Sequence, residues 1–169
     1  MSYSNIEFVT VESSEQIELL ARLADEIWHE HFPGIITYEQ VDYMVEKFQS
    51  APAITKQIAE GGYTYNLIYS GGVLSGYTGY VKEESKLFLS KLYVKKEMRG
   101  RSIASEAFDL LEGICRENGL RAVYLTVNKN NQTTIDIYKH KGFFVREEKC
   151  ADIGNGMVMD DYVMEKIIR

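Results

Sequence analysis

The sequence predicts an α+β fold: a single domain with a central mixed, mostly antiparallel twisted sheet of about seven strands and helices on both faces. Three observations predict it. Short segments with the composition and alternation of strands recur along the chain. Amphipathic segments with helical spacing lie between them. The 169 residues show no linker, repeat or low-complexity stretch, so we expect one domain over residues 1–169.

The first third of the chain is expected to be mainly helical. Residues 5–13 (NIEFVTVES) alternate and are rich in β-branched and aromatic residues, which is typical of a strand. The helical segments that follow are residues 14–32, 37–49 and 50–62. Ser13 or Ser14 is placed to cap the first of them, and Thr37 stands three residues before Gln40, which is the spacing of a capping box.

The rest of the chain is expected to be mainly extended. Strands are expected at residues 63–70, 73–83, 86–94, 121–127, 143–153 and 154–168. Amphipathic helices are expected at residues 102–119 and 131–142. Gly71 and Gly72 join the first two of these strands through a tight turn.

Composition and charge exclude several classes of protein. A net charge of −6 disfavours a general nucleic-acid binder. No apolar run is long enough to span a membrane, and the first residues lack the basic and apolar regions of a signal peptide. Cys115 and Cys150 lack CxxC spacing, which suits two thiols in a reducing compartment. We therefore expect a cytoplasmic protein with no nucleic-acid or membrane partner.

One short segment runs against the acidic balance. Residues 91–101 (KLYVKKEMRGR) carry five basic residues and one acidic residue, between an expected strand and an expected helix. A solvated charge run is one interpretation. A phosphate site is the other, because the start of a helix presents free backbone N–H groups and partial positive charge. The turn RGRSIA is neither a Walker A loop nor GxGxxG, but it fits Arg/Gln-x-x-Gly-x-Gly/Ala, with Ser102 and Ala104 at the small positions.

A second motif follows the next expected strand. The stretch VNKNNQTTIDIYKHKGF resembles Val-Asn-x-x-Asn-x-x-Ala-Ile-x-x-Tyr-x-x-x-Gly-Phe, with Asn128, Asn131 and Tyr138 in register. With the basic turn, it identifies the chain as similar to the GNAT superfamily of acyl-CoA-dependent N-acetyltransferases. The resemblance is strong over residues 87–144. The helical opening and the ending DIGNGMVMDDYVMEK are similar to bacterial members near the polyamine acetyltransferases.

The resemblance implies acetyl-CoA as co-substrate and places it on the chain. In the family, the strand before the turn pairs with the pantetheine arm as an added strand, which here implies Leu92, Tyr93 and Val94. The turn would hold the pyrophosphate, through Arg99, Gly100, Arg101, Ser102, Ile103 and Ala104. Asn131 and Asn128 would bind the cofactor as well. Helix capping is the alternative role of these asparagines.

Tyr138 is the residue that the resemblance implies for chemistry. The matching tyrosine lies beside the thioester sulfur, where a phenol with a pKa near 10 is suited to protonate the departing thiolate. A backbone N–H of the Leu92–Tyr93 segment would hold the developing oxyanion. The alternative is a core tyrosine above the Gly-Phe turn.

Two departures from the family pattern leave open questions. Ser102 replaces the usual glycine, and a serine is a good helix cap. Ser90 stands where many relatives carry a glutamate that acts as a base through water, and a serine does not take a proton unaided at pH 7. His31 has a suitable pKa for that role, although a surface histidine is the simpler interpretation. An amine that arrives neutral, without a dedicated base, is a further alternative.

The acceptor side of the site is the least defined. Trp28, His31 and Phe32 are candidates to wall it, and Asp160 and Asp161 are candidates to hold a cationic amine. Core aromatic residues and a polar hairpin edge are the competing interpretations. The spacing of His29 and His31 does not form a metal pair, and we predict no metal site.

The favoured interpretation is an N-acetyltransferase that acts on a primary amine of a small molecule, with a polyamine as one candidate. An enzyme that acetylates peptides or proteins is the alternative within enzymes, and an acetyl-CoA-binding sensor without catalysis is the alternative outside them. The family resemblance also suggests a homodimer. The sequence leaves the acceptor, the base and the acyl-chain preference open.

Overall fold

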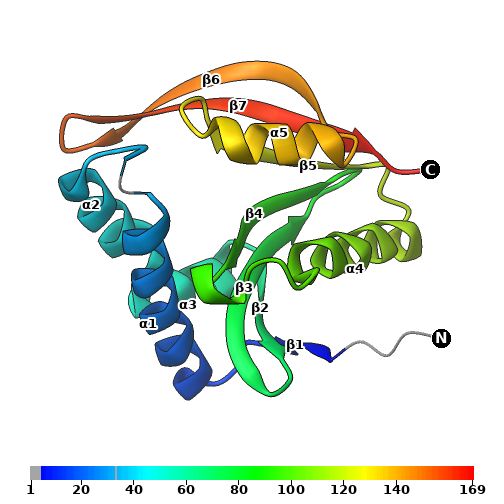
Figure 1. The fold of residues 1–169 in the computed structure, drawn as a ribbon, viewed down its shortest axis with the longest axis horizontal. Helices are drawn as coiled ribbons and strands as arrows, with labels where there is room; N and C mark the ends of the chain where they lie inside the picture. The colour runs from blue at the N-terminus through cyan, green and yellow to red at the C-terminus, as the bar shows by residue number, and fades with distance from the viewer. Residues whose placement is uncertain (1–4, 33) are drawn as a thin grey trace. The chain divides into compact units, whose positions relative to one another are not determined.

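The computed structural model describes residues 5–32 and 34–169, and the chain divides into two compact units. The first unit contains the described residues up to Val81 together with Ser90–Leu110, and the second contains Lys82–Leu89 and Leu111–Arg169. The strands form a seven-stranded sheet in the order β1-β2-β3-β4-β5-β7-β6. Together with the helices this confirms the predicted α+β fold (Figure 1).

The elements lie close to the predicted segments. The strands are β1 (Ile6–Thr10), β2 (Tyr63–Ser70), β3 (Val73–Lys82), β4 (Leu87–Val94), β5 (Ala122–Asn128), β6 (Phe144–Gly154) and β7 (Met157–Ile167). The helices are α1 (Ser14–His31), α2 (Tyr38–Gln49), α3 (Ala51–Glu60), the short 3₁₀ helix η1 (Lys96–Met98), α4 (Ile103–Asn118) and α5 (Gln132–His140). The sequence did not predict η1, because three residues are too few for a periodic pattern.

Local caps set the helix starts in the first unit. Ser13 accepts a hydrogen bond from the backbone of Gln16, and the Gln16 side chain accepts one from the backbone of Ser13, which completes a capping box. Thr37 caps α2 by accepting from the backbone N–H of Gln40. Ser50 begins α3 in the same way. These contacts fix where the helices that pack on the sheet begin.

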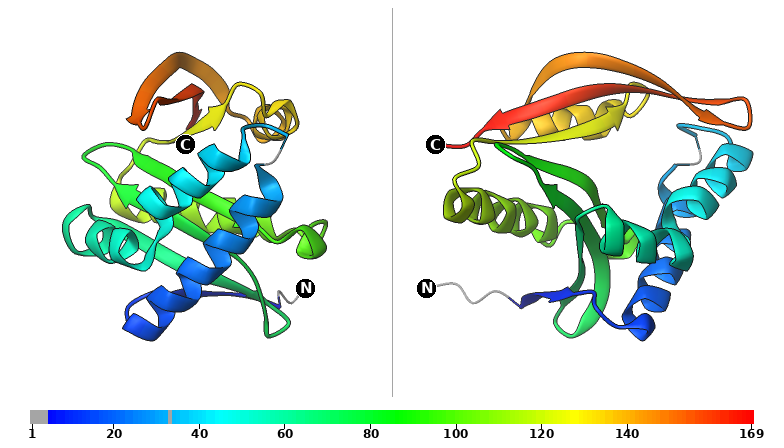
Figure 2. Two further views of the ribbon diagram at one scale, coloured as in Figure 1. Left: turned by 90° about the vertical axis from the view of Figure 1, so that its left-hand side faces the viewer. Right: turned by 180° about the vertical axis from the view of Figure 1, so that it is seen from behind.

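Helices lie on both faces of the sheet in the first unit. Figures 1 and 2 show α1 on one side of β2–β4 and the beginning of α4 on the other. Trp28 of α1 reaches Tyr77 of β3 on the first face. Ile103 of α4 packs with Ile68 of β2 on the second, beside Leu92 of β4. The alternation of side chains along a strand accounts for this division.

The second unit is built on long antiparallel strands. β7 pairs with β5 on one side and with β6 on the other, for example Leu125 with Met164 and Lys149 with Asp161. The beginning of β4 runs parallel to β5, through Leu87 opposite Val123. No helix among the described residues is long and apolar enough to cross a membrane.

Candidate functional site

The basic turn adopts a backbone that few residue types favour. Gly100 has a φ of 78° and Ser102 a φ of 63°, so both lie in the left-handed region. Glycine occupies this region freely, whereas a serine there is strained. The α-helix begins directly afterwards, with the Glu106 N–H donating to the Ser102 carbonyl at 3.0 Å. The structure therefore gives the predicted strand–turn–helix, but Ser102 lacks the extended backbone usual at a helix cap.

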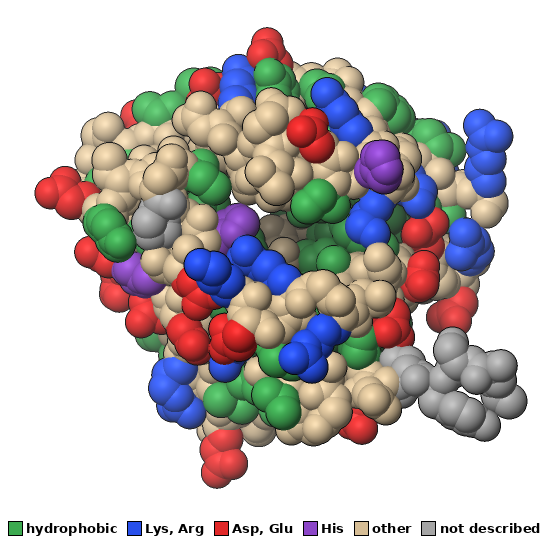
Figure 3. Space-filling view, viewed as in Figure 1, with side chains coloured by type: hydrophobic (Ala, Val, Ile, Leu, Met, Phe, Trp, Pro, Cys, Tyr) green, Lys and Arg blue, Asp and Glu red, His purple; other side chains and the backbone are tan. Residues whose placement is uncertain are grey.

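The turn is tied to α1 by polar contacts. Glu30 accepts a hydrogen bond from the Lys96 backbone at 2.8 Å. Lys95 Nζ lies 3.6 Å from a carboxylate oxygen of Glu26. Arg99 Nη2 lies 3.5 Å from His31 Nδ1. Figure 3 shows basic and acidic side chains next to one another on this part of the surface. The segment joins a left-handed turn, a helix start and the basic residues of 91–101.

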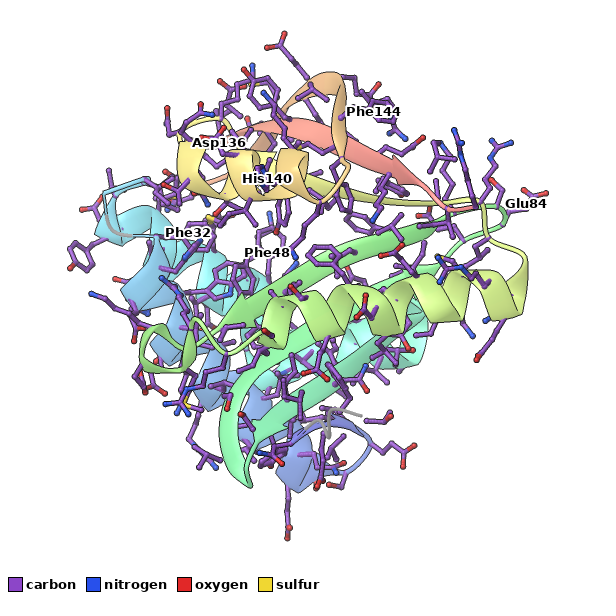
Figure 4. All side chains as sticks on the ribbon, turned by 45° about the vertical axis from the view of Figure 1, so that its right-hand side comes forward. Phe32, Phe48, Glu84, Asp136, His140 and Phe144 are labelled. Atoms are coloured by element: carbon purple, nitrogen blue, oxygen red, sulfur yellow. The ribbon has the colours of Figure 1, made fainter. Side chains whose placement is uncertain are left out.

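The predicted aromatic residues of α1 form a cluster with β4. The rings of Trp28, His31 and Phe32 lie 5.7, 5.7 and 6.0 Å from that of Tyr93. Trp28 and Phe32 are buried, which favours their role as core residues; Figure 4 labels Phe32 at the end of α1. Burial, with a smaller effect of Arg99, lowers the pKa of His31, so its imidazole is neutral at pH 7.

A buried hydrogen-bond network supports this cluster. The Trp28 indole donates to Tyr77 Oη at 2.7 Å, and the Tyr77 hydroxyl donates to Gln49 Oε1 at 2.7 Å. The Gln49 amide in turn donates to Tyr65 Oη at 3.1 Å. Sequence reasoning missed Gln49, since its partners lie on distant strands. The network satisfies polar groups that would be costly to bury alone.

The sequence placed Lys91 in the basic run of residues 91–101, but the structure gives it an environment of its own. Its Nζ donates to Ser90 Oγ at 2.7 Å, and the Ser90 hydroxyl shares a hydrogen bond of 3.0 Å with Tyr63 Oη. Lys91 Nζ lies 6.0 Å from the centre of the Trp28 ring. Burial lowers the pKa of Lys91 to about 8. The available signal was a lone lysine inside an otherwise apolar strand.

Tyr138 lies on α5 in the second unit. Its carbonyl accepts from the Phe143 N–H at 3.0 Å, and the two rings are 5.7 Å apart. Burial raises the pKa of Tyr138 to about 12. The pKa of this phenol is therefore further from the thiol pKa of about 8.5 than the pKa of an unperturbed phenol would be. The phenol stays protonated across the physiological pH range.

The two asparagines of the second motif have structural roles. Asn131 caps α5, where its side chain accepts from the Thr134 N–H at 3.3 Å. Asn128 Oδ1 accepts from the Asn130 N–H at 2.8 Å. The capping role is therefore present for Asn131, and the turn before α5 is stabilised from within.

The two aspartates of β7 differ sharply in environment. Asp160 is exposed and pairs with Lys129 at 3.0 Å. Asp161 is 6% exposed, and burial, reinforced by the charge of Asp160, raises its pKa to about 6. The described residues include no group of three or more His, Cys, Asp and Glu that could hold a metal ion.

The predicted residues are divided between the two units. Those in the first unit are Trp28, His31, Phe32, Leu92, Tyr93, Val94, Arg99, Gly100, Arg101, Ser102, Ile103 and Ala104. Those in the second are Asn128, Asn131, Tyr138, Asp160 and Asp161. Within the first unit, the aromatic cluster and the basic turn contact one another through His31 and Arg99.

Comparison with known proteins gives consistent relatives. Residues 20–143 match the profile of the Acetyltransferase (GNAT) family. A spermidine N(1)-acetyltransferase of Thermoplasma acidophilum is 23% identical over 158 residues, covering 91% of this chain and 92% of that protein. The crystal structure of the PaiA N-acetyltransferase of Thermoplasma acidophilum, in complex with coenzyme A, aligns with a TM-score of 0.77 and 23% identity over 99% of both chains. Ard1 of Thermoplasma volcanium aligns with a TM-score of 0.70 and 17% identity over 98% of this chain and 99% of its own.

Proposed function

The chain belongs to the acetyltransferase (GNAT) family, and we propose on this basis that it transfers acetyl from acetyl-CoA to a primary amine of a small molecule by direct attack. It is an acyltransferase, and acetyl-CoA is its co-substrate. The observation that carries the proposal is the left-handed turn at Gly100 and Ser102, which follows β4 and η1 and precedes α4 among basic residues.

The turn has the chemistry that a pyrophosphate requires. The partial positive charge at the start of α4 and the charges of Arg99 and Arg101 favour an anion there. Gly100 has no atom within 4 Å of where its Cβ would be, so its surroundings are open. We assign the pyrophosphate to residues 99–104 and the pantetheine arm to Leu92, Tyr93 and Val94. We also propose that Asn128 and Asn131 bind the cofactor, in addition to their structural roles.

The reaction forms an N–C bond and breaks the C–S bond of the thioester. The acceptor must lose a proton before it attacks, and the departing thiolate must be stabilised. We propose that the Tyr138 hydroxyl donates a hydrogen bond to the departing sulfur. Because its pKa is about 12, the hydroxyl keeps its proton at neutral pH and stabilises the departing thiolate through this hydrogen bond. A backbone N–H of the Leu92–Tyr93 segment is proposed to hold the oxyanion.

A polyamine is the acceptor that we propose first. Support comes from the spermidine N(1)-acetyltransferase relative, which is 23% identical over 158 residues. Asp160 is exposed and acidic, which suits the distal ammonium of such a substrate. Trp28 and Phe32 are proposed to support the acceptor wall from the core.

We propose further that residues 1–169 work as one domain in the cytoplasm, as a homodimer and without nucleic-acid or membrane partners. The family match over residues 20–143 crosses both compact units, which supports a single functional domain. The acidic net charge of −6 supports the absence of a nucleic-acid partner.

Release of free thiol from acetyl-CoA tests the proposal. The purified protein is incubated with acetyl-CoA and spermidine, spermine, amino acids, aminoglycosides or peptides with free N-termini, and acetyl-CoA binding is measured by calorimetry. We expect thiol release with polyamines well above the rate without an amine. Thiol release only with peptides would mean that the acceptor is a peptide or protein and not a small molecule. Binding of acetyl-CoA without thiol release in the presence of any amine would favour a sensor.

A further inference from the structure

Ser90 is part of a polar contact that the proposed function does not yet use. It lies in β4, two residues before Leu92, where the proposed function places the pantetheine arm. Its Oγ accepts from Lys91 Nζ at 2.7 Å and shares a hydrogen bond of 3.0 Å with Tyr63 Oη. The Ser90 hydroxyl is therefore not isolated, because hydrogen bonds join it to an amine and to a phenol.

The groups that face this pair come from several elements. Trp28 of α1 presents its ring to Lys91 Nζ at 6.0 Å, and Tyr63 of β2 reaches Ser90. Thr78 of β3 donates its hydroxyl to the Lys91 carbonyl at 2.8 Å, which fixes the backbone at this position. Tyr63 is the titratable residue among these three partners. The two residues are thus held by aromatic rings and hydroxyl groups.

Lys91 lacks the partner that would keep it charged. Among residues 5–32 and 34–169, no carboxylate lies within ion-pair distance of its Nζ. Burial accordingly lowers the pKa of Lys91 to about 8, so a large fraction is neutral at slightly alkaline pH. In the neutral form its nitrogen carries a lone pair in place of the third proton, and this lone pair accepts a hydrogen bond or a proton. A lysine in this state is a base, as buried lysines elsewhere are.

His31 is the alternative base within the same unit, and its surroundings suit that role less. Burial lowers the pKa of His31, and the Arg99 guanidinium, whose Nη2 lies 3.5 Å from His31 Nδ1, lowers it further. Lys91 has no cation at that distance among its described contacts. The Ser90–Lys91 hydrogen bond, at 2.7 Å, is also shorter than the His31–Arg99 contact, at 3.5 Å.

We propose that Ser90 and Lys91 form a proton-accepting pair for the acceptor amine, in place of a carboxylate base. This rests on the proposed function. The acceptor ammonium gives a proton to Ser90 Oγ while the Ser90 hydroxyl proton passes to Lys91 Nζ. The acceptor becomes a neutral amine, Lys91 becomes an ammonium, and Lys91 later releases this proton to solvent. The second amine proton, lost as the N–C bond forms, balances the protonation of the departing sulfur. Tyr63 holds Ser90 Oγ in place.

The pH profile of kcat/KM tests the pair. Wild-type enzyme, Lys91→Arg, Ser90→Ala and the control Lys56→Gln, on an exposed lysine of α3, are compared with spermidine from pH 6 to 10. Lys91→Arg keeps a cation that cannot give up its proton, and we expect a loss of roughly 100-fold in kcat/KM with unchanged acetyl-CoA affinity. Ser90→Ala should lose a similar factor, and Lys56→Gln should lose none. The double variant Ser90→Glu/Lys91→Gln supplies a carboxylate and should regain activity at lower pH.

A second readout does not depend on turnover. In protein labelled with ¹³C at lysine Cε, the Lys91 signal, assigned through Lys91→Gln, should titrate near pH 8. Titration above pH 10, or a folded Lys91→Arg enzyme within threefold of wild-type activity, would overturn the pair. If the wild type binds acetyl-CoA but acetylates no amine, the proposed function fails, and the proposal for Ser90 and Lys91 fails with it. An active Lys91→Arg enzyme would instead contradict the Ser90–Lys91 pair and leave the proposed function intact.

Discussion

Gly76 of β3 lies so close to Tyr93 of β4 that a Cβ on Gly76 would be 2.3 Å from the Tyr93 carbonyl oxygen. The neighbouring contact, from Lys95 N–H to the Ser75 carbonyl at 2.8 Å, keeps the strands together at this point. The segment of β4 that we assign to pantetheine can therefore occupy this position only because residue 76 of β3 is a glycine. No side-chain rotation relieves a clash with a backbone oxygen.

Gly76→Ala should consequently displace β4 at Tyr93. We expect the free energy of unfolding to fall by about 1–3 kcal/mol and acetyl-CoA to bind at least roughly tenfold more weakly. Urea unfolding and calorimetry measure the two effects. Gly113→Ala is the matched control, because this α4 glycine has nothing within 4 Å of the new Cβ and alanine favours helix. Unchanged affinity in a folded Gly76→Ala protein would separate β4 from cofactor binding.

Ser102→Gly should relieve strain in the basic turn. The φ of 63° costs a serine about 1–2 kcal/mol, partly offset by the greater freedom of glycine in the unfolded chain. We expect the free energy of unfolding to rise by about 0.5–1 kcal/mol, with acetyl-CoA affinity kept or improved. Ser102→Val should lower both, because a branched side chain is disfavoured at positive φ. A destabilised Ser102→Gly protein would show that the serine hydroxyl stabilises the turn.

His29 should contribute to stability mainly at acidic pH. Its hydrogen bond to Asp42 of α2, with that to the Asp25 backbone of α1, raises its pKa above 6.5. Because the folded pKa is raised, the contribution is complete below the unfolded pKa of about 6.5 and is lost as pH rises through the folded pKa. We expect His29→Gln to lower the melting temperature more at pH 5.5 than at pH 9. An equal loss at both pH values would mean that the charge of His29 is irrelevant.

Asp161 should show the opposite relation between charge and stability. Its pKa is raised to about 6, so the unfolded state releases this proton first and stability falls as pH rises from about 4 to 6. Asp161→Asn should therefore stabilise the protein at pH 7.5 by on the order of 1 kcal/mol, and have little effect below pH 4. If Asp161 also binds the amine, the same variant should raise KM for spermidine. A destabilised variant at pH 7.5 would assign the carboxylate a structural role.

Tyr138→Phe should separate binding from turnover. Loss of the hydroxyl should lower kcat by about 100-fold while calorimetry gives unchanged acetyl-CoA affinity. The pKa of about 12 also predicts that the wild-type rate shows no loss from this group up to pH 10. Phe143→Leu, beside the same ring, is a packing control. Equal turnover by Tyr138→Phe and wild type would remove this tyrosine from the reaction.

Most of the fold was predictable because its signals are local. The cap at Ser13, the cap at Thr37 and the turn at Gly71-Gly72 are fixed by residues a few positions apart. The basic turn was also found, because its residues are contiguous. The positive φ of Ser102 was not predicted. A serine at this place suggests an ordinary helix cap, and the motif does not indicate a left-handed backbone.

The environment of the site residues was less accessible from sequence. Lys91 appeared as one charge in a basic run, and its lowered pKa follows from packing beside Trp28, 63 positions earlier. Gln49 looked like the end of an amphipathic helix, yet it is fully buried between Tyr65 and Tyr77. The difference between Asp160 and Asp161 likewise depends on burial, which two adjacent identical residues do not reveal.

Transfer of a labelled acetyl group is the most direct test of the central claim. Acetyl-CoA with a ¹³C acetyl group is incubated with the protein and spermidine, and the products are followed by mass spectrometry together with thiol release. We predict labelled monoacetyl-spermidine in equal amount to the thiol released. Thiol release without a labelled amine would mean hydrolysis, and the absence of both product and acetyl-CoA binding would contradict the assignment of residues 99–104 as a phosphate turn.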